Sequence, residues 1–237
     1  MITGIVVALS EELTTLTAQK VSKGTVHFIS ESVLLIYSGA GSVNAAAAAE
    51  LLIEKGANRL LSWGCAAALA LALKPGDLVL ADKLIDTDNV HYLLDVDWHR
   101  HVTDTLATKV NVKAGYLAHS EVIVSSRKDK KELHVKTGAV ALDMESMAIA
   151  KVAIQYGLPI LAIRVIADPA NMNLPLAITH SLNEQGDVMI KKLLLFILLR
   201  PSELPGLIKL GLHFKAAKKT LASVARHLDQ VTDFNCG

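Results

Sequence analysis

Short apolar runs that end close to a carboxylate recur along this chain, and they constrain its fold more than any other feature. The three runs span residues 5–9, 138–142 and 159–166. The acids that follow them are Glu11 and Glu12, Asp143 and Glu145, and Asp168. Such runs are typical of buried strands, and in an open α/β sheet ligands bind beyond the carboxyl ends of the strands. The sequence therefore predicts that these acids meet in one reaction centre.

Strand-like and helix-like segments alternate along the whole chain. We expect strands at residues 2–9, 25–29, 33–37, 59–63, 77–85, 112–118, 138–142 and 158–166. We expect helices at residues 43–55, 99–109, 127–135, 145–156 and 180–199. This order predicts an α/β fold with a mixed, largely parallel central sheet flanked by helices. We expect one catalytic domain over residues 1–200 and a C-terminal extension over residues 201–237.

Composition excludes several classes of protein. The 237 residues carry a net charge of +1, so the basic excess that is usual in nucleic-acid-binding proteins is missing. Two cysteines cannot form a disulfide framework, and no secretion signal is visible, which indicates the cytoplasm. We expect no metal, since His99 and His101 lack a carboxylate or cysteine at ligand spacing.

A glycine-containing turn, residues 38–44, lies between an expected strand and an expected helix. Its Gly41 allows a ligand to approach the backbone, and the helix N-terminus offers free N–H groups. A tight turn needed only for packing is the equal alternative. The third glycine of a dinucleotide-binding motif is replaced by Asn44, so we do not expect NAD.

Small residues, 64–68, follow the next strand. They leave room for a flat ligand, although close helix–sheet packing is the alternative. We do not expect Cys65 to be a nucleophile, because no histidine stands nearby in sequence to activate it.

The remaining acids also have two interpretations. At a strand-to-helix junction, one of Asp143 and Glu145 caps the helix and the other faces the site; alternatively both only complement the helix dipole. Asp168 precedes Pro169, which favours an extended backbone at Asp168. Its alternative is a loop acid or an N-cap.

Taken in order along the chain, these sequence segments resemble the nucleoside phosphorylase and nucleosidase superfamily, especially the methylthioadenosine/S-adenosylhomocysteine nucleosidases. The resemblance spans about residues 2 to 198. The segments that carry it are residues 4–12, Ser38-Gly39-Ala40-Gly41, Lys74-Pro75-Gly76-Asp77, Asp143-Met144-Glu145 and residues 164–168.

The resemblance implies cleavage of an N-glycosidic bond, with roles for individual residues. Glu12 resembles the residue that activates water, and Asp168 resembles the acid that protonates the leaving purine. The implied substrate-binding residues are Glu145 for the ribose, Met144 for the wall under the sugar, Cys65, Ala66 and Ala67 for the base and sugar pocket, and Asp143, Gly41 and Arg164. The resemblance implies no cofactor, and a homodimer or larger homo-oligomer.

The chain departs from the family pattern at three places, one of which is residues 86–102, a middle segment that matches the family poorly. Ala167 stands where the family usually has a serine whose hydroxyl orients the catalytic aspartate, and residues 65–68 replace the usual Ser-Ala-Gly-Gly loop. The acids Glu11 and Glu12 would repel phosphate, so we favour hydrolysis over phosphorolysis.

The residues from Pro201 onward exceed what we expect of a nucleosidase. A 3,4 spacing of apolar residues predicts an amphipathic helix. Its stripe is Leu207, Leu210, Phe214, Ala217, Leu221, Val224 and Leu228, and its cations are Lys209, Lys215, Lys218, Lys219 and Arg226. The stripe either packs on the protein itself or on a second subunit, or it lies on a membrane surface.

This tail and residues 138–146 also resemble the nucleoside phosphorylase-like proteins associated with hopanoid biosynthesis. That resemblance implies a lipid-linked adenine nucleoside, adenosylhopane, as substrate. The alternatives are a methylthioadenosine/S-adenosylhomocysteine nucleosidase, a phosphorolytic nucleoside phosphorylase, and a non-catalytic nucleoside-binding or membrane-docking module.

Overall fold

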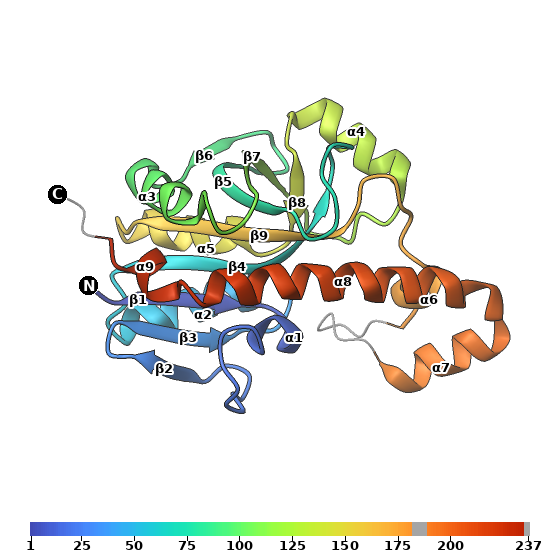
Figure 1. Ribbon diagram of the computed structural model, residues 1–237, viewed down its shortest axis with the longest axis horizontal. Helices are drawn as coiled ribbons and strands as arrows, with labels where there is room; N and C mark the ends of the chain where they lie inside the picture. Colours follow the sequence, from blue (N-terminus) through green and yellow to red (C-terminus); the bar gives the residue numbers. More distant parts are fainter. Residues whose placement is uncertain (182–188, 235–237) are drawn as a thin grey trace.

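A single mixed sheet organises the molecule, as the computed structural model in Figure 1 shows; the structure describes residues 1–181 and 189–234. The strands are β1 (Thr3–Val7), β2 (Val26–Ser30), β3 (Val33–Tyr37), β4 (Arg59–Ala68), β5 (Leu78–Ile85), β6 (His91–Leu93), β7 (Val112–His119), β8 (Ala141–Asp143) and β9 (Ile160–Asp168). The helices are α1 (Ser10–Leu13), α2 (Ser42–Glu54), α3 (Val96–Leu106), α4 (Arg127–Thr137), α5 (Ser146–Gln155), α6 (Leu176–Thr179), α7 (Ile190–Leu199), α8 (Leu204–Ala225) and α9 (Leu228–Thr232).

The sheet is closed in part. Its strand order is β2-β3-β1-β4-β8-β7-β5-β6, and β9 pairs with both β4 and β5. Strands β4, β8, β7, β5 and β9 therefore form a closed ring. Among the described strands, five pairings are parallel and four antiparallel. The prediction of an α/β domain with a mixed sheet is confirmed.

Both faces of the sheet are covered by helices, which explains the unbroken apolar runs. Successive side chains point to opposite faces: Leu60 packs with helices α2 and α5, whereas Leu61 packs with α3, α8 and α9. The central strands β1, β3, β4 and β9 are therefore apolar at most of their positions. The carboxyl ends of β1, β4 and β9 all run toward the end of the molecule that carries α6 and α7 (Figure 1).

Several boundaries differ from the expected ones. β4 continues to Ala68, where we expected a loop, because its last residues pair with β9 and β8. The strand expected at residues 138–142 forms only over β8. The helix expected at residues 180–199 is present as α7, and residues 182–188 lie outside the described part of the chain. The short elements β6 and α1 carry no periodic signal and were not expected.

The predicted stripe on the C-terminal helix faces the sheet. Ala217, Leu221 and Val224 are fully buried, and α8 packs along β9 (Figure 1). The Thr220 hydroxyl also donates a hydrogen bond to the Gly76 carbonyl, at 2.8 Å. Leu228 is buried as well, and the earlier stripe residues are partly buried. The stripe therefore packs on its own domain and is not free to lie on a membrane. Within the described residues, no helix is long and apolar enough to cross a bilayer.

Candidate active site

Arg164, in the middle of β9, is the centre of a buried polar cluster. Its Nε donates to Asp143 Oδ2 at 2.5 Å, and its Nη2 donates to Ser62 Oγ at 2.7 Å and to Ser146 Oγ at 3.1 Å. Burial by itself would lower the pKa of Arg164, but the nearby carboxylates of Asp143, Glu145 and Glu12 raise it. Arg164 therefore stays charged and organises the cluster from inside the protein.

The two acids at the start of α5 have different partners. The Asp143 carboxylate accepts the N–H of Ser146, the first residue of α5, at 3.2 Å and pairs with Arg164. Glu145 Oε1 accepts the N–H of Gly41 at 3.0 Å, and its Oε2 lies 3.9 Å from Arg164 Nη2. Burial and the neighbouring Asp143 raise the pKa of Glu145, against the opposing effect of Arg164. Asp143 thus caps the helix, and Glu145 faces the glycine-containing turn.

Glu12 reaches the same cluster from α1. Its carboxylate accepts the N–H of Cys65 at 2.7 Å and the N–H of Leu9 at 3.2 Å. Burial raises its pKa to about 7, although Arg164 and the two N–H donors lower it. A Cβ on Gly64 would lie 2.7 Å from Arg164 Nη1 and 2.8 Å from the Glu12 oxygens, so glycine is needed there. Glu12 is therefore a carboxylate poised to exchange a proton near neutral pH.

The end of β4 lies between Glu12 and Asp168. Cys65 and Ala67 point to one side of the strand and are partly exposed, whereas Ala66 points to the other side and is buried in the core. Burial raises the pKa of the Cys65 thiol well above its ordinary value, and the Glu12 carboxylate adds to that effect. The thiol therefore remains protonated, which agrees with the expectation that Cys65 is no nucleophile.

Asp168 is placed by an irregularity at the end of β9. Ile166 pairs with Ala66 and Asp168 pairs with Ala67, so Ala167 is an extra residue on β9. A bulge of this kind redirects the side chains that follow it.

Lys130 of α4 holds the Asp168 carboxyl group. Its Nζ lies 2.6 Å from Asp168 Oδ2 and also donates to the carbonyls of Met172 at 2.9 Å and Pro169 at 3.2 Å. The lysine is fully buried, and all three of its N–H donors are used. Burial raises the pKa of Asp168, while Lys130 lowers it. Asp168 Oδ1 is buried and has no hydrogen-bond partner within residues 1–181 and 189–234. One carboxyl oxygen is thus fixed by Lys130, and the other keeps its hydrogen-bonding capacity unused.

The structure brings together Glu12, Asp143, Glu145, Arg164 and Gly41. Asp168 lies at the end of β9, the strand that also carries Arg164, and pairs with Ala67 of β4. Met144 lies between the acids of this cluster and is half-buried; its carbonyl accepts the Ser42 hydroxyl at 3.1 Å. Sequence reasoning missed Lys130. It lies in the run Lys128-Asp129-Lys130-Lys131, where nothing in the local pattern separates a buried lysine from its exposed neighbours.

A cavity of about 540 Å³ lies at the carboxyl ends of β5 and β7. Asp86, His119 and Asp129 line it, together with other residues of α4, but none of Glu12, Glu145 and Asp168 does. The Asp86 carboxylate is already bound by the N–H groups of Asp88 and Val90. The unpartnered carboxyl oxygen of Asp168 and the proton-poised Glu12 make the β1, β4 and β9 ends the stronger candidate for chemistry.

Residues 3–193 match the model of the phosphorylase superfamily. The chain belongs to this superfamily. It is 26% identical over 217 residues to the 5'-methylthioadenosine/S-adenosylhomocysteine nucleosidase of Oceanobacillus iheyensis, covering 78% of this chain and 94% of that protein. It is also 26% identical to the corresponding Staphylococcus aureus enzyme over 197 residues, covering 71% of this chain and 86% of that protein.

Solved structures show the same fold. The Helicobacter pylori 5'-methylthioadenosine/S-adenosylhomocysteine nucleosidase superposes with a TM-score of 0.71 at 19% identity, covering 98% of this chain and 97% of that one. Futalosine hydrolase of Helicobacter pylori gives 0.70 at 19% identity, with the same coverage. The expected superfamily and the expected class of enzyme, an N-glycosyl-bond-cleaving hydrolase, agree with these relatives. The family model ends at residue 193, and the division into a domain of residues 1–200 and an extension of residues 201–237 stays a prediction.

Proposed function

We propose that this chain hydrolyses the N-glycosidic bond of an adenine nucleoside and releases adenine. The observation that carries the proposal is the asymmetry of the Asp168 carboxyl group: Lys130 holds Oδ2, and the buried Oδ1 has no hydrogen-bond partner among the described residues. A carboxyl group with a raised pKa and one free oxygen is suited to deliver a proton to a leaving base. The names of the relatives, which are nucleosidases, support the same reaction.

The proposed reaction uses the two sides of β4. As the bond between C1′ and the purine nitrogen breaks, the sugar gains positive charge and the base gains negative charge. Asp168 donates its proton to N7 of the departing adenine. Glu12 orients a water molecule, whose oxygen bonds to C1′ while its proton passes to the Glu12 carboxylate. Glu145 accepts hydrogen bonds from the ribose hydroxyls. Cys65 and Ala67 line the space between the two acids.

Water is favoured over phosphate as the second reactant. Arg164 faces Glu12 and Glu145, and the N–H groups on its Nε and Nη2 already donate to Asp143, Ser62 and Ser146. The carboxylates of Glu12 and Glu145 would repel a phosphate anion at the same place.

The leading substrate is adenosylhopane, a lipid-linked nucleoside, with methylthioadenosine or S-adenosylhomocysteine as the second candidate. The resemblance of residues 138–146 and of the C-terminal segment to hopanoid-associated proteins supports the first. We further propose a cytoplasmic homodimer or larger homo-oligomer, which contacts the inner face of the membrane.

The test is adenine release, followed by chromatography, from adenosylhopane and from methylthioadenosine in parallel, each with and without phosphate. We expect release from the lipid-linked nucleoside that does not depend on phosphate. Comparable release from methylthioadenosine would instead indicate an ordinary salvage nucleosidase. A phosphate requirement would indicate phosphorolysis, and bound nucleoside without any release would indicate a binding module.

A further inference from the structure

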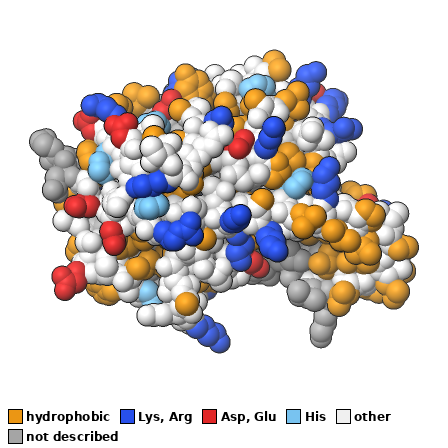
Figure 2. Space-filling view, in the orientation of Figure 1, with side chains coloured by type: hydrophobic (Ala, Val, Ile, Leu, Met, Phe, Trp, Pro, Cys, Tyr) orange, Lys and Arg blue, Asp and Glu red, His pale blue; other side chains and the backbone are white. Residues whose placement is uncertain are grey.

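Helix α7 and the first half of α8 expose a continuous set of aliphatic side chains, which we call the α7–α8 apolar surface. Its members, with their exposed fractions, are Leu194 (62%), Leu195 (59%), Leu198 (78%) and Leu199 (73%) of α7, and Leu204 (44%), Ile208 (57%) and Leu212 (61%) of α8. Figure 2 shows apolar side chains gathered at the end of the molecule where these helices lie. Single exposed leucines are common in proteins, but a cluster of seven marks a contact surface.

These residues are not needed to pack α8 on the sheet. The core-facing stripe of α8 uses Ala217, Leu221 and Val224, which are fully buried. The exposed residues Leu204, Ile208 and Leu212 follow a spacing of four, so they form a separate row on the helix surface. On α7, Leu194 and Leu198 are also four residues apart, as are Leu195 and Leu199. Both helices thus present a second apolar face, for which the described protein offers no cover.

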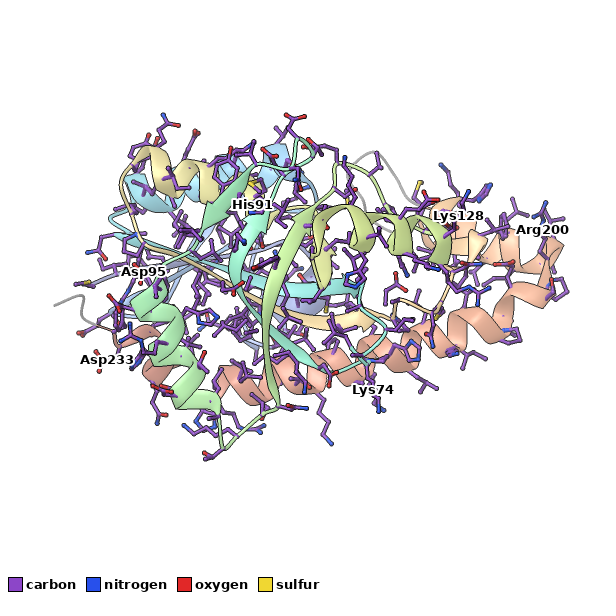
Figure 3. All side chains as sticks on the ribbon, turned by 90° about the horizontal axis from the view of Figure 1, so that it is seen from above. Lys74, His91, Asp95, Lys128, Arg200 and Asp233 are labelled. Carbon is purple, nitrogen blue, oxygen red and sulfur yellow. The ribbon has the colours of Figure 1, made fainter. Side chains whose placement is uncertain are left out.

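The same segment is strongly basic, although the chain as a whole is nearly neutral. Residues 192–219 hold six of the 24 Lys and Arg residues but only one of the 23 Asp and Glu residues. The cations are Lys192, Arg200, Lys209, Lys215, Lys218 and Lys219, and the acid is Glu203. Arg200 lies at the tip of the turn between the helices, at the end of the molecule opposite Asp233 (Figure 3). Apolar side chains bordered by cations are complementary to an anionic lipid surface. They are a poor match for a second copy of the same surface, since that contact would bring like charges together.

We propose that the α7–α8 apolar surface docks the protein on an anionic membrane, with its leucines in the interfacial layer and its cations among the lipid head groups. The carboxyl ends of β1, β4 and β9 run toward this end of the molecule (Figure 1). The candidate active site therefore lies toward the end of the molecule that would face the lipid. The idea that docking presents a lipid-linked nucleoside to the site rests on the proposed function. The docking proposal by itself does not depend on that function.

The experiment is flotation of the full chain with two kinds of vesicle, one of phosphatidylcholine alone and one that also contains phosphatidylglycerol, without any nucleoside. We expect binding to the anionic vesicles only. The double substitution Leu198→Glu/Leu199→Glu replaces the two most exposed leucines of the α7–α8 apolar surface. It should reduce binding by at least about 100-fold, since each substitution removes the burial of a large apolar side chain in the lipid. Ile208→Glu/Leu212→Glu tests the α8 half of the surface in the same way.

The matched control is Leu93→Glu/Val135→Glu. Leu93 on β6 and Val135 on α4 are exposed to 72% and 77%, like the α7 leucines, but lie outside the surface. This control should float as the unaltered protein does, and circular dichroism should show that all variants are folded. A charge variant, Lys192→Gln/Lys209→Gln, should weaken anionic binding on the order of 10-fold.

Two outcomes would overturn the proposal. The first is flotation that the Leu198→Glu/Leu199→Glu variant leaves unchanged. The second is an absence of flotation together with a self-associated species, measured by sedimentation, that this variant dissociates; the surface would then join copies of the chain. Adenine release from water-soluble methylthioadenosine, assayed with the same variants, keeps the two proposals apart. Flotation without any adenine release refutes the proposed function alone, and release without flotation refutes docking alone.

Discussion

Glu12 and Asp168 are both buried carboxyl groups at strand ends, yet the protein holds them in different ways. Glu12 is bound by two backbone N–H groups, which are neutral and fixed in position. The charge of Arg164, which lies in the same buried polar cluster, lowers the pKa of Glu12. Asp168 is bound by one ammonium group, that of Lys130, through one oxygen only. Burial raises the pKa of both groups. Burial thus makes a carboxyl group available for proton transfer near neutral pH. Its hydrogen-bond partners decide which of the two oxygens can carry the proton.

The substitution Asp168→Asn should have the largest effect. Asparagine keeps the shape of the side chain but cannot donate a carboxyl proton to the leaving base. We expect kcat to fall about 1000-fold, within the range of 10² to 10⁴ that general acids contribute, with nucleoside binding largely retained. Steady-state adenine release and equilibrium binding measure the two effects. A kcat within threefold of the unaltered protein would remove Asp168 from the proposed mechanism.

The substitution Glu12→Gln should lower kcat about 100-fold. Glutamine cannot accept the proton of water, although its amide oxygen still accepts the Cys65 N–H. In the unaltered protein the rate should rise as pH increases through about 7, the pKa of Glu12, because the proposed base must be deprotonated. This acid limb of the pH profile should disappear in the variant. The neighbouring substitution Glu11→Gln, at an exposed position, is the control and should leave the profile unchanged.

Most of the fold could be predicted from the sequence, because the central strands β1, β3, β4 and β9 are buried on both faces and are mainly apolar. The site could be predicted only in part. Glu12, Asp143, Glu145 and Asp168 follow strands, and that local order is visible in the chain. The closed ring of strands and the contact between Lys130 and Asp168 join residues far apart in sequence. The spacing of apolar residues along the chain does not indicate such contacts.

The contacts of the C-terminal helix could likewise be predicted only in part from the sequence. Its 3,4 spacing correctly indicated an apolar stripe, but periodicity cannot tell which of several surfaces covers a stripe. The sheet covers it here, and the exposed leucines that remain belong to another face of α8 and to α7.

The substitution Lys130→Met tests whether the lysine sets the pKa and the orientation of Asp168. Lys130 lowers the pKa of Asp168, so its loss should raise that pKa further. Because the proposed acid must be protonated, the alkaline limb of the pH profile should move to higher pH. We also expect kcat to fall about 10-fold at its optimum, since the carboxyl group loses its fixed orientation. The exposed neighbour provides the control, Lys131→Met, which should change neither quantity. An alkaline limb that stays in place, or that moves to lower pH, would contradict the positioning role of Lys130.

The smallest expected effect is the contribution of Glu12 to the pH dependence of the unfolding free energy. The pKa of Glu12 is about 7 in the folded protein and 4.5 as its ordinary value. Between these values the folded state binds more protons than the unfolded state, so the stabilisation by the Glu12 proton is fully present below pH 4.5 and is lost as pH rises through about 7. The difference in unfolding free energy between the unaltered protein and Glu12→Gln should therefore change by about 1 kcal/mol from pH 6 to pH 7. Urea unfolding of both proteins at the two pH values measures it. Parallel pH dependences would show that burial does not raise this pKa, and the distinction between the two carboxyl groups would then depend on Lys130 alone.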